Sequence, residues 1–188
     1  MAAYNLEDCQ LVVEIFESTE LMAFSLERGR LTGLELDRPG GSVAAFDYLY
    51  LPRLHRKGFV APVADLEQSI SSPGGYVLDS KPGIFEDVVL LDFKSLYPSI
   101  IRTFHVDPLA MIVASEESDP IPGFKESQFS RDNYILPEII ENLWDARDQA
   151  KKLKKTAMSQ AIKIIMNSFY GVMGTTGCRF FDPKLASS

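Results

Sequence analysis

Apolar residues at helical spacing predict two helices in the first third of the chain. The first covers residues 4 to 28, with Asn5 as its N-cap and Gly29 as its stop. Ser42 is the expected N-cap of the second, and Pro52 should kink or interrupt it. The apolar positions are Leu11, Val12, Ile15 and Phe16 in the first helix, and Val43, Phe46, Tyr50 and Leu54 in the second.

The helical pattern then breaks, and short apolar runs predict strands. Proline, glycine and serine interrupt residues 60–81, which indicates a boundary between two structural units. Residues 88–91 are too short for a helix and include two adjacent valines, so we expect a buried strand that ends at Asp92. Residues 76–78 and 109–113 are further candidate strands. Residues 115–122 are rich in Glu, Asp, Ser and Pro, a composition typical of a loop.

The last third of the chain is helical in pattern from residue 136 onward. A break near residues 155–158 precedes a second helix over residues 159–169, which Gly171 and Gly174 should end. Because the connection is short, the two helices should pack as an antiparallel hairpin. The expected fold class is therefore α+β: mainly helical, with a small partial β-sheet and an antiparallel helical hairpin.

Composition narrows the class of protein without identifying it. A chain of 188 residues with 46% hydrophobic content is expected to fold around one core or two small ones. A net charge of −7 argues against a basic surface overall, yet a local groove can still be positive. No signal peptide precedes Tyr4, and no apolar run reaches the ~20 residues of a membrane span. We therefore expect a soluble, cytoplasmic protein without a membrane partner.

Cysteine and histidine do not indicate a metal centre. Cys9 and Cys178 match neither a disulfide framework nor a metal motif, so we expect buried, reduced thiols. His55 and His105 have no partner at ligand spacing.

The first candidate site surrounds Asp92. A carboxylate at a strand end, beside a helix that begins near Pro98, can hold a divalent cation while backbone N–H groups face a phosphate. Ser95, Tyr97 and Ser99 lie nearby in the sequence. An Asp that caps a helix is an equally good explanation from spacing alone.

The second candidate site lies on the helical hairpin. Lys163, Asn167 and Tyr170 share one face of the second helix, and Arg147 and Lys151 are four residues apart on the first. Cations that face inward from both helices would form a pocket for a polyanion such as a triphosphate. A solvated helix face is the alternative, and we favour it for the remaining basic residues, namely Lys152, Lys154, Lys155, and the cluster Arg53, His55, Arg56 and Lys57.

Two motifs decide between these alternatives through their resemblance to a known family. The decapeptide at residues 92–101, Asp-Phe-Lys-Ser-Leu-Tyr-Pro-Ser-Ile-Ile, is similar to motif A of the family B DNA polymerases. Residues 163–171 are similar to motif B of the same family, Lys-x-x-x-Asn-Ser-x-Tyr-Gly. Residues 41–46, 72–76 and 174–183 look like its bacterial branch, the DNA polymerase II group.

The resemblance implies a DNA-directed DNA polymerase that adds deoxynucleotides to a primer 3′ end by two-metal phosphoryl transfer with Mg²⁺. Asp92 would bind both ions, with the backbone carbonyl of Phe93 as a further ligand. Ser95 and Leu96 would contact the triphosphate through their backbone. Tyr97 would lie under the sugar and exclude a 2′-hydroxyl.

Motif B carries the resemblance onto the hairpin, which corresponds to the fingers. Lys163 and Asn167 would bind the triphosphate, and Tyr170 would lie near the nascent base pair. Arg147 and Lys151 match the Arg-x-x-x-Lys of the opposite fingers helix. The implied partners are primer–template DNA, deoxynucleoside triphosphates and, in a full-length protein, a sliding clamp.

A further likeness concerns proofreading. The segment from Tyr4 to Asp8 resembles the third motif of the family's 3′→5′ exonuclease, Tyr-x-x-x-Asp, in which the Asp holds a metal and the Tyr orients water. An ordinary amphipathic helix is the alternative. The Tyr-x-Gly-Gly element of the family departs here because Ser72 stands in place of its tyrosine, so the primer–template sensing of that element is not carried over.

The resemblance also implies a domain organisation. Residues 1–58 would end the exonuclease domain, 59–85 would link it to the palm, 86–134 would start the palm, 135–173 would form the fingers and 174–188 would return to the palm. The chain contains no Asp-x-Asp, the family's second aspartate motif. We therefore expect a fragment that is inactive alone and that self-associates through an unpaired sheet edge. The alternatives are a noncatalytic nucleic-acid-binding module of polymerase-like shape and a protein-interaction domain.

Overall fold

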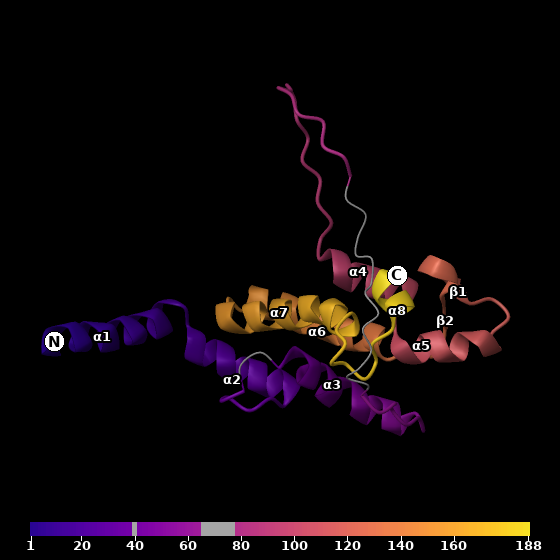
Figure 1. Cartoon of the computed structure of the whole chain (residues 1–188), viewed down its shortest axis with the longest axis horizontal. Helices are drawn as coiled ribbons and strands as arrows, with labels where there is room; N and C mark the ends of the chain where they lie inside the picture. The colour runs from indigo at the N-terminus through magenta and orange to yellow at the C-terminus, as the bar shows by residue number, and fades with distance from the viewer. Residues whose placement is uncertain (39–40, 65–77) are drawn as a thin grey trace.

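The computed structural model describes residues 1–38, 41–64 and 78–188, and it is mainly helical with one small sheet (Figure 1). The expected α+β class is confirmed. The α-helices are α1 (Ala2–Ser18), α2 (Leu21–Thr32), α3 (Ser42–Arg56), α4 (Leu96–Phe104), α5 (Pro108–Val113), α6 (Leu136–Lys152), α7 (Thr156–Met173) and α8 (Pro183–Ser187). The short 3₁₀ helices are η1 (Ala114–Glu116) and η2 (Phe124–Glu126), and strands β1 (Ile121–Pro122) and β2 (Gln128–Phe129) pair antiparallel.

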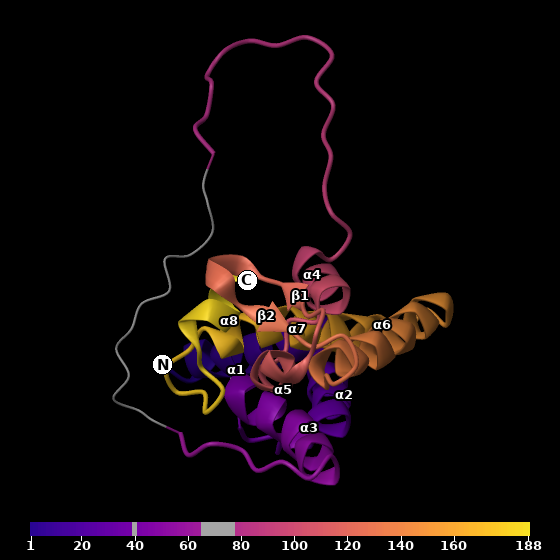
Figure 2. The ribbon, with the colours of Figure 1, turned by 90° about the vertical axis from the view of Figure 1, so that its right-hand side faces the viewer.

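The core forms around α7, which packs against α2, α3, α4, α6 and α8. The α6–α7 hairpin is present as predicted, and both views show its helices side by side (Figures 1 and 2). Phe46 of α3 lies at the centre: it stacks on Tyr50 at 5.0 Å and meets Phe169 of α7 edge-on at 5.4 Å, between ring centroids. Aromatic burial of this kind fixes α3 against the hairpin.

The N-terminal region is helical as predicted, but its helix boundaries differ from the prediction. The helix begins at Ala2 rather than at Asn5 and breaks at Glu20, whose φ of 52° interrupts the helical backbone. It resumes and passes Gly29 to end at Gly33, whose φ of 77° suits a residue without a Cβ. At Gly29 a Cβ would lie 3.0 Å from the carbonyl oxygen of Leu34, so this glycine permits a close approach inside the helix.

The expected apolar side of the first helix is exposed. α1 has no buried residue and projects from the rest of the molecule (Figure 1), so Cys9 is an exposed thiol, contrary to expectation. Cys178 is buried as expected. Pro52 does not interrupt α3, which is continuous from Ser42 to Arg56.

Two of the three predicted strands, residues 88–91 and 109–113, are not strands in this structure. Residues 88–91 form an extended, exposed segment, with Leu90 92% exposed, because no strand in the described part of the chain pairs with their backbone. Residues 109–113 are helical in α5, since Pro108 occupies its first turn and the Asp107 carboxylate accepts a hydrogen bond from the N–H of Ala110. Of the third candidate, residues 76 and 77 lie outside the described residues, as do residues 72–75 and much of the linker.

The hairpin differs from its prediction only at the ends of α7. This helix begins at Thr156 and passes Gly171 to end at Gly174, so it is longer at both ends than expected. The expected loop over residues 115–122 contains the end of η1 and strand β1. Among the described residues, no helix is long and apolar enough to cross a membrane.

Candidate functional site

Helix α4, which carries most of motif A, packs against α6 and α7 and brings Tyr97 of motif A beside Tyr170 of motif B. The rings of Tyr97 on α4 and Tyr170 on α7 stack with centroids 4.3 Å apart and planes inclined by 11°. The hydroxyl of Tyr170 donates a hydrogen bond of 2.8 Å to the carbonyl oxygen of Ala186 on α8. Burial and the neighbouring Tyr97 raise the pKa of Tyr170.

Arg147 of α6 lies beside the start of α4. One of its terminal nitrogens, Nη1, is 3.5 Å from the hydroxyl of Ser95, which is the N-cap of α4. Its Nε is buried and has no hydrogen-bond partner among the described residues. The first N–H groups of a helix are also unsatisfied within the helix and attract anions. Arg147 and the first turn of α4, where Leu96 is exposed, therefore form a positively polarised corner.

The other predicted cations lie on the hairpin surface. Lys163 and Asn167 are exposed and lie one turn apart on α7, and Tyr170 follows on the same face. Lys151 on α6 approaches Asp148 at 4.0 Å, a pairing on the same helix. Lys94 and Arg102, from the two ends of the α4 region, lie 5.6 and 5.2 Å from the ring centroid of Trp144 on α6. These cation–π contacts join the α4 region to the hairpin a second time.

Asp92 and Phe93 lie in the exposed segment that precedes α4. A carboxylate and a carbonyl oxygen are the type of ligand that Mg²⁺ prefers. In the described part of the chain, however, no group of three or more acidic, histidine or cysteine side chains is placed to hold a metal ion. The donor set present is thus of the right chemistry and is too small for a pair of ions.

The predicted exonuclease residues are separate from this group. Tyr4 and Asp8 are exposed on α1, one turn apart. Tyr4 is 74% exposed.

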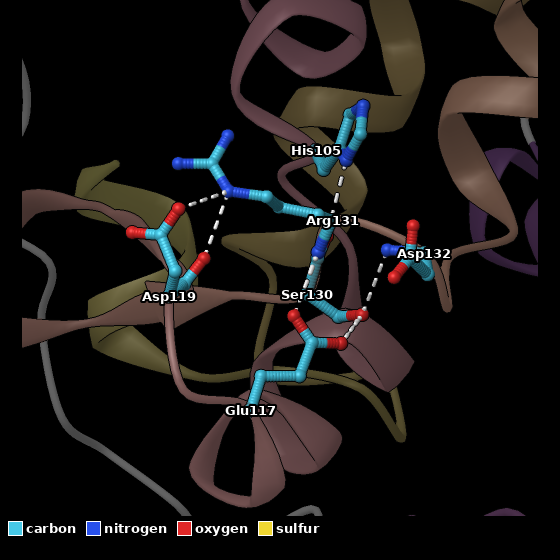
Figure 3. Close-up of polar contacts among 6 residues, drawn as sticks. All are labelled: His105, Glu117, Asp119, Ser130, Arg131 and Asp132. Atoms are coloured by element: carbon cyan, nitrogen blue, oxygen red, sulfur yellow. Dashed lines mark hydrogen bonds and ion pairs between the residues drawn. The ribbon is translucent and has the colours of Figure 1, made fainter.

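Sequence reasoning missed two polar networks that support the site. Figure 3 shows the first, in which the Glu117 carboxylate accepts hydrogen bonds from the Ser130 hydroxyl and from the N–H of Arg131. Both hydrogen bonds lower the pKa of Glu117. Arg131 Nε also lies 3.2 Å from the carboxylate of Asp119, and His105 Nδ1 lies 3.0 Å from the carbonyl oxygen of Ser130. Together these contacts fix the turn that leads into α6.

The second network centres on Asp107, which is fully buried. Burial raises the pKa of its carboxyl, whereas hydrogen bonds from backbone N–H groups and from the Tyr50 hydroxyl act in the opposite direction. The Asp-Pro pair at residues 107 and 108 is a recognisable start of a helix. This signal could have predicted a helix, rather than a strand, at residues 109–113.

Comparisons with known proteins agree with the motifs. A sequence profile of DNA polymerase family B matches residues 40–188. DNA polymerase II of Escherichia coli K12 is 56% identical over 191 residues, which cover 100% of this chain and 24% of that protein. A DNA polymerase of Thermococcus gorgonarius is 30% identical over 208 residues, which cover 100% of this chain and 26% of that protein.

A solved structure supports the fold. The family B DNA polymerase from the hyperthermophilic archaeon Pyrobaculum calidifontis matches with a TM-score of 0.72 and 24% sequence identity, over 96% of this chain and 26% of that one. The chain therefore spans about a quarter of the length of these relatives. The profile match over most of the chain confirms the resemblance inferred from the two motifs: this protein belongs to DNA polymerase family B.

Proposed function

We propose that this chain supplies the nucleotide-binding part of a DNA-directed DNA polymerase, which extends a primer 3′ end on a DNA template. One observation carries the proposal: the packing of α4 on the α6–α7 hairpin joins Ser95 and Tyr97 of motif A to Arg147 and to Tyr170 of motif B. In this proposal residues 86–134 belong to the palm and residues 135–173 form the fingers.

Each residue of the group has a role that follows from its chemistry. Transfer of a nucleotide builds negative charge on the departing pyrophosphate, and Arg147, Lys151 and Lys163 are cations that stabilise such charge. Asn167 can donate to the same phosphate oxygens, as can the backbone N–H groups at the start of α4. Tyr97 would lie under the sugar, and its ring would exclude a 2′-hydroxyl.

Asp92 and the carbonyl of Phe93 would hold Mg²⁺ at the edge of this group. When bound, a pair of such ions activates the primer hydroxyl and stabilises charge on the pyrophosphate. Because the donor set here is too small for two ions, we expect the isolated chain to bind one ion weakly, together with a triphosphate, and to catalyse no templated incorporation.

The proposal includes a proofreading role for Tyr4 and Asp8. It is supported by their exposure on one face of α1, where Asp8 could bind a metal and Tyr4 a water molecule. A sliding-clamp partner and a cytoplasmic location stay predictions from the resemblance. Self-association is supported by the exposed apolar run at residues 88–91, and light scattering across a range of protein concentrations measures it.

The test titrates the purified chain with a deoxynucleoside triphosphate in the presence and absence of Mg²⁺, by isothermal calorimetry. We expect weak, Mg²⁺-dependent binding that Asp92→Ala and Lys163→Ala each reduce. Lys155→Ala is the matched control, since Lys155 is exposed at the N-cap of α7, about two helical turns before Lys163. Equal effects of the two lysine changes would contradict the assigned face.

The same preparation separates the alternatives. Primer extension above background would contradict the expected inactivity, because it would require a second metal-binding carboxylate. Binding of DNA without any Mg²⁺-dependent triphosphate binding would favour the noncatalytic nucleic-acid-binding module.

A further inference from the structure

Asp107 lies where three parts of the molecule meet. It follows the end of α4 at Phe104 and is the N-cap of α5. Its side chain also reaches the start of α6, although 29 residues separate it from Leu136. It is 0% exposed, and no lysine or arginine in the described part of the chain pairs with it.

Hydrogen bonds from four groups converge on this carboxylate. Oδ1 accepts from the N–H of Ala110 at 2.8 Å, and Oδ2 accepts from the N–H groups of Ile135 at 3.2 Å and Leu136 at 2.7 Å. The Tyr50 hydroxyl lies 3.1 Å from each oxygen. Unsatisfied N–H groups at a helix start favour an acceptor, above all an anionic one, so the carboxylate holds the starts of α5 and α6 together.

Tyr50 extends this connection to α3. Its hydroxyl accepts from the N–H of Leu109 at 3.0 Å while it contacts Asp107, so it has a partner on each side. Its ring is 0% exposed and stacks on Phe46. A buried hydroxyl held in this way cannot be removed without leaving the N–H of Leu109 unsatisfied.

The contacts of Asp107 and Tyr50 bear on the packing of α6 against α4. Tyr97 is on α4, Arg147 is on α6, and α4 ends three residues before Asp107. The separation of Arg147 from Ser95 depends on the angle between the two helices, and the Asp107 carboxylate connects the chain just after α4 to the start of α6. The network of Figure 3 supports the same connection from the loop side, because Ser130 also donates its N–H to the carbonyl oxygen of Ala110 at 3.0 Å.

We propose that Asp107 and Tyr50 form a positioning pair that sets the geometry of the triphosphate pocket by fixing the fingers hairpin against the motif A helix. This inference rests on the proposed function. The pair touches neither nucleotide nor metal; it acts through α6, on which Arg147 lies.

The test compares two substitutions with matched controls. Tyr50→Phe removes one buried hydroxyl, and Tyr48→Phe makes the same change at an exposed position of α3. Asp107→Ser leaves one oxygen that can cap α5 and removes the second oxygen, which binds the start of α6, whereas Asp37→Ser makes the same change at an exposed position. All variants are made in the whole chain, and unfolding in urea identifies the conditions in which each is fully folded.

Two readouts separate positioning from stability. The first is the affinity for a deoxynucleoside triphosphate with Mg²⁺. The second is the emission of Trp144, the single tryptophan, which contacts the α4 region through Lys94 and Arg102 and therefore reports the α4–α6 geometry. We expect Tyr50→Phe and Asp107→Ser to weaken triphosphate binding by about tenfold and to change Trp144 emission in the folded protein, with both controls unchanged.

A lower urea midpoint with unchanged affinity and emission would overturn the proposal and leave a purely stabilising role. If Asp107→Ser does not fold, Tyr50→Phe decides by the same criteria. If the wild-type chain binds no triphosphate, the proposed function fails, and unchanged emission in Tyr50→Phe would overturn the positioning pair separately.

Discussion

Arg147→Met should weaken triphosphate binding strongly without destabilising the fold. Nη1 of the guanidinium lies 3.5 Å from the Ser95 hydroxyl, and its Nε is buried without a partner among the described residues. An unsatisfied buried polar group costs about 1–3 kcal/mol. Methionine keeps an apolar stem of similar length and removes that group, so the free energy of unfolding should stay within about 1 kcal/mol of wild type, or rise.

The effect on binding should be large, because the terminal nitrogens of Arg147 lie beside the start of α4, where we propose that a triphosphate binds. Hydrogen bonds to charged groups contribute about 1.5–3 kcal/mol, which corresponds to roughly a 10- to 150-fold loss of affinity. Calorimetric titration with a deoxynucleoside triphosphate and Mg²⁺ measures this loss, and urea unfolding followed by circular dichroism measures stability. Arg56→Met is the control, since Arg56 is exposed in the last turn of α3. A clear loss of stability with unchanged affinity would refute the reasoning and make Arg147 a structural residue.

Three other measurements test the site, the thiols and the stable unit of the fold. In a chimera where this chain replaces the matching region of E. coli DNA polymerase II, Tyr97→Val should admit ribonucleotides with little loss of deoxynucleotide use, because only steric exclusion is removed. An unchanged ratio of kcat/KM between the two sugars would contradict this role of Tyr97. A thiol reagent at mildly alkaline pH should label Cys9 rapidly and Cys178 only after unfolding, because Cys178 is buried and burial raises its pKa to about 11. Rapid labelling of both thiols in the folded protein would contradict this. Hydrogen exchange should be slow in the α6–α7 hairpin and fast at residues 88–91, and equal rates would show that the hairpin is not the stable unit.

Helical periodicity and two local motifs determined much of this protein in advance. The α6–α7 hairpin, the helix after Asp92 and the apolar side of α3 that carries Phe46 and Tyr50 were all predicted, because helix formation and a face of apolar residues are local properties of the sequence. The motifs also indicated Tyr97, Arg147 and Tyr170 as members of one site. In the structure Tyr97 stacks on Tyr170 and Arg147 lies beside Ser95, and a common site for all of them stays a prediction.

Tertiary structure decided whatever depends on a partner distant in sequence. The apolar run at residues 88–91 has the composition of a strand, yet a strand also requires a neighbour for its N–H and C=O groups, and the described residues provide none. Residues 109–113 have a similar composition and became helical because the Asp107 carboxylate caps their first turn. The start of α6 likewise depends on contacts of Asp107 with Tyr50 and Leu136, which only the folded chain brings together. The local sequence therefore does not predict the conformation of such residues, because the hydrogen bonds that decide it join segments far apart in the chain.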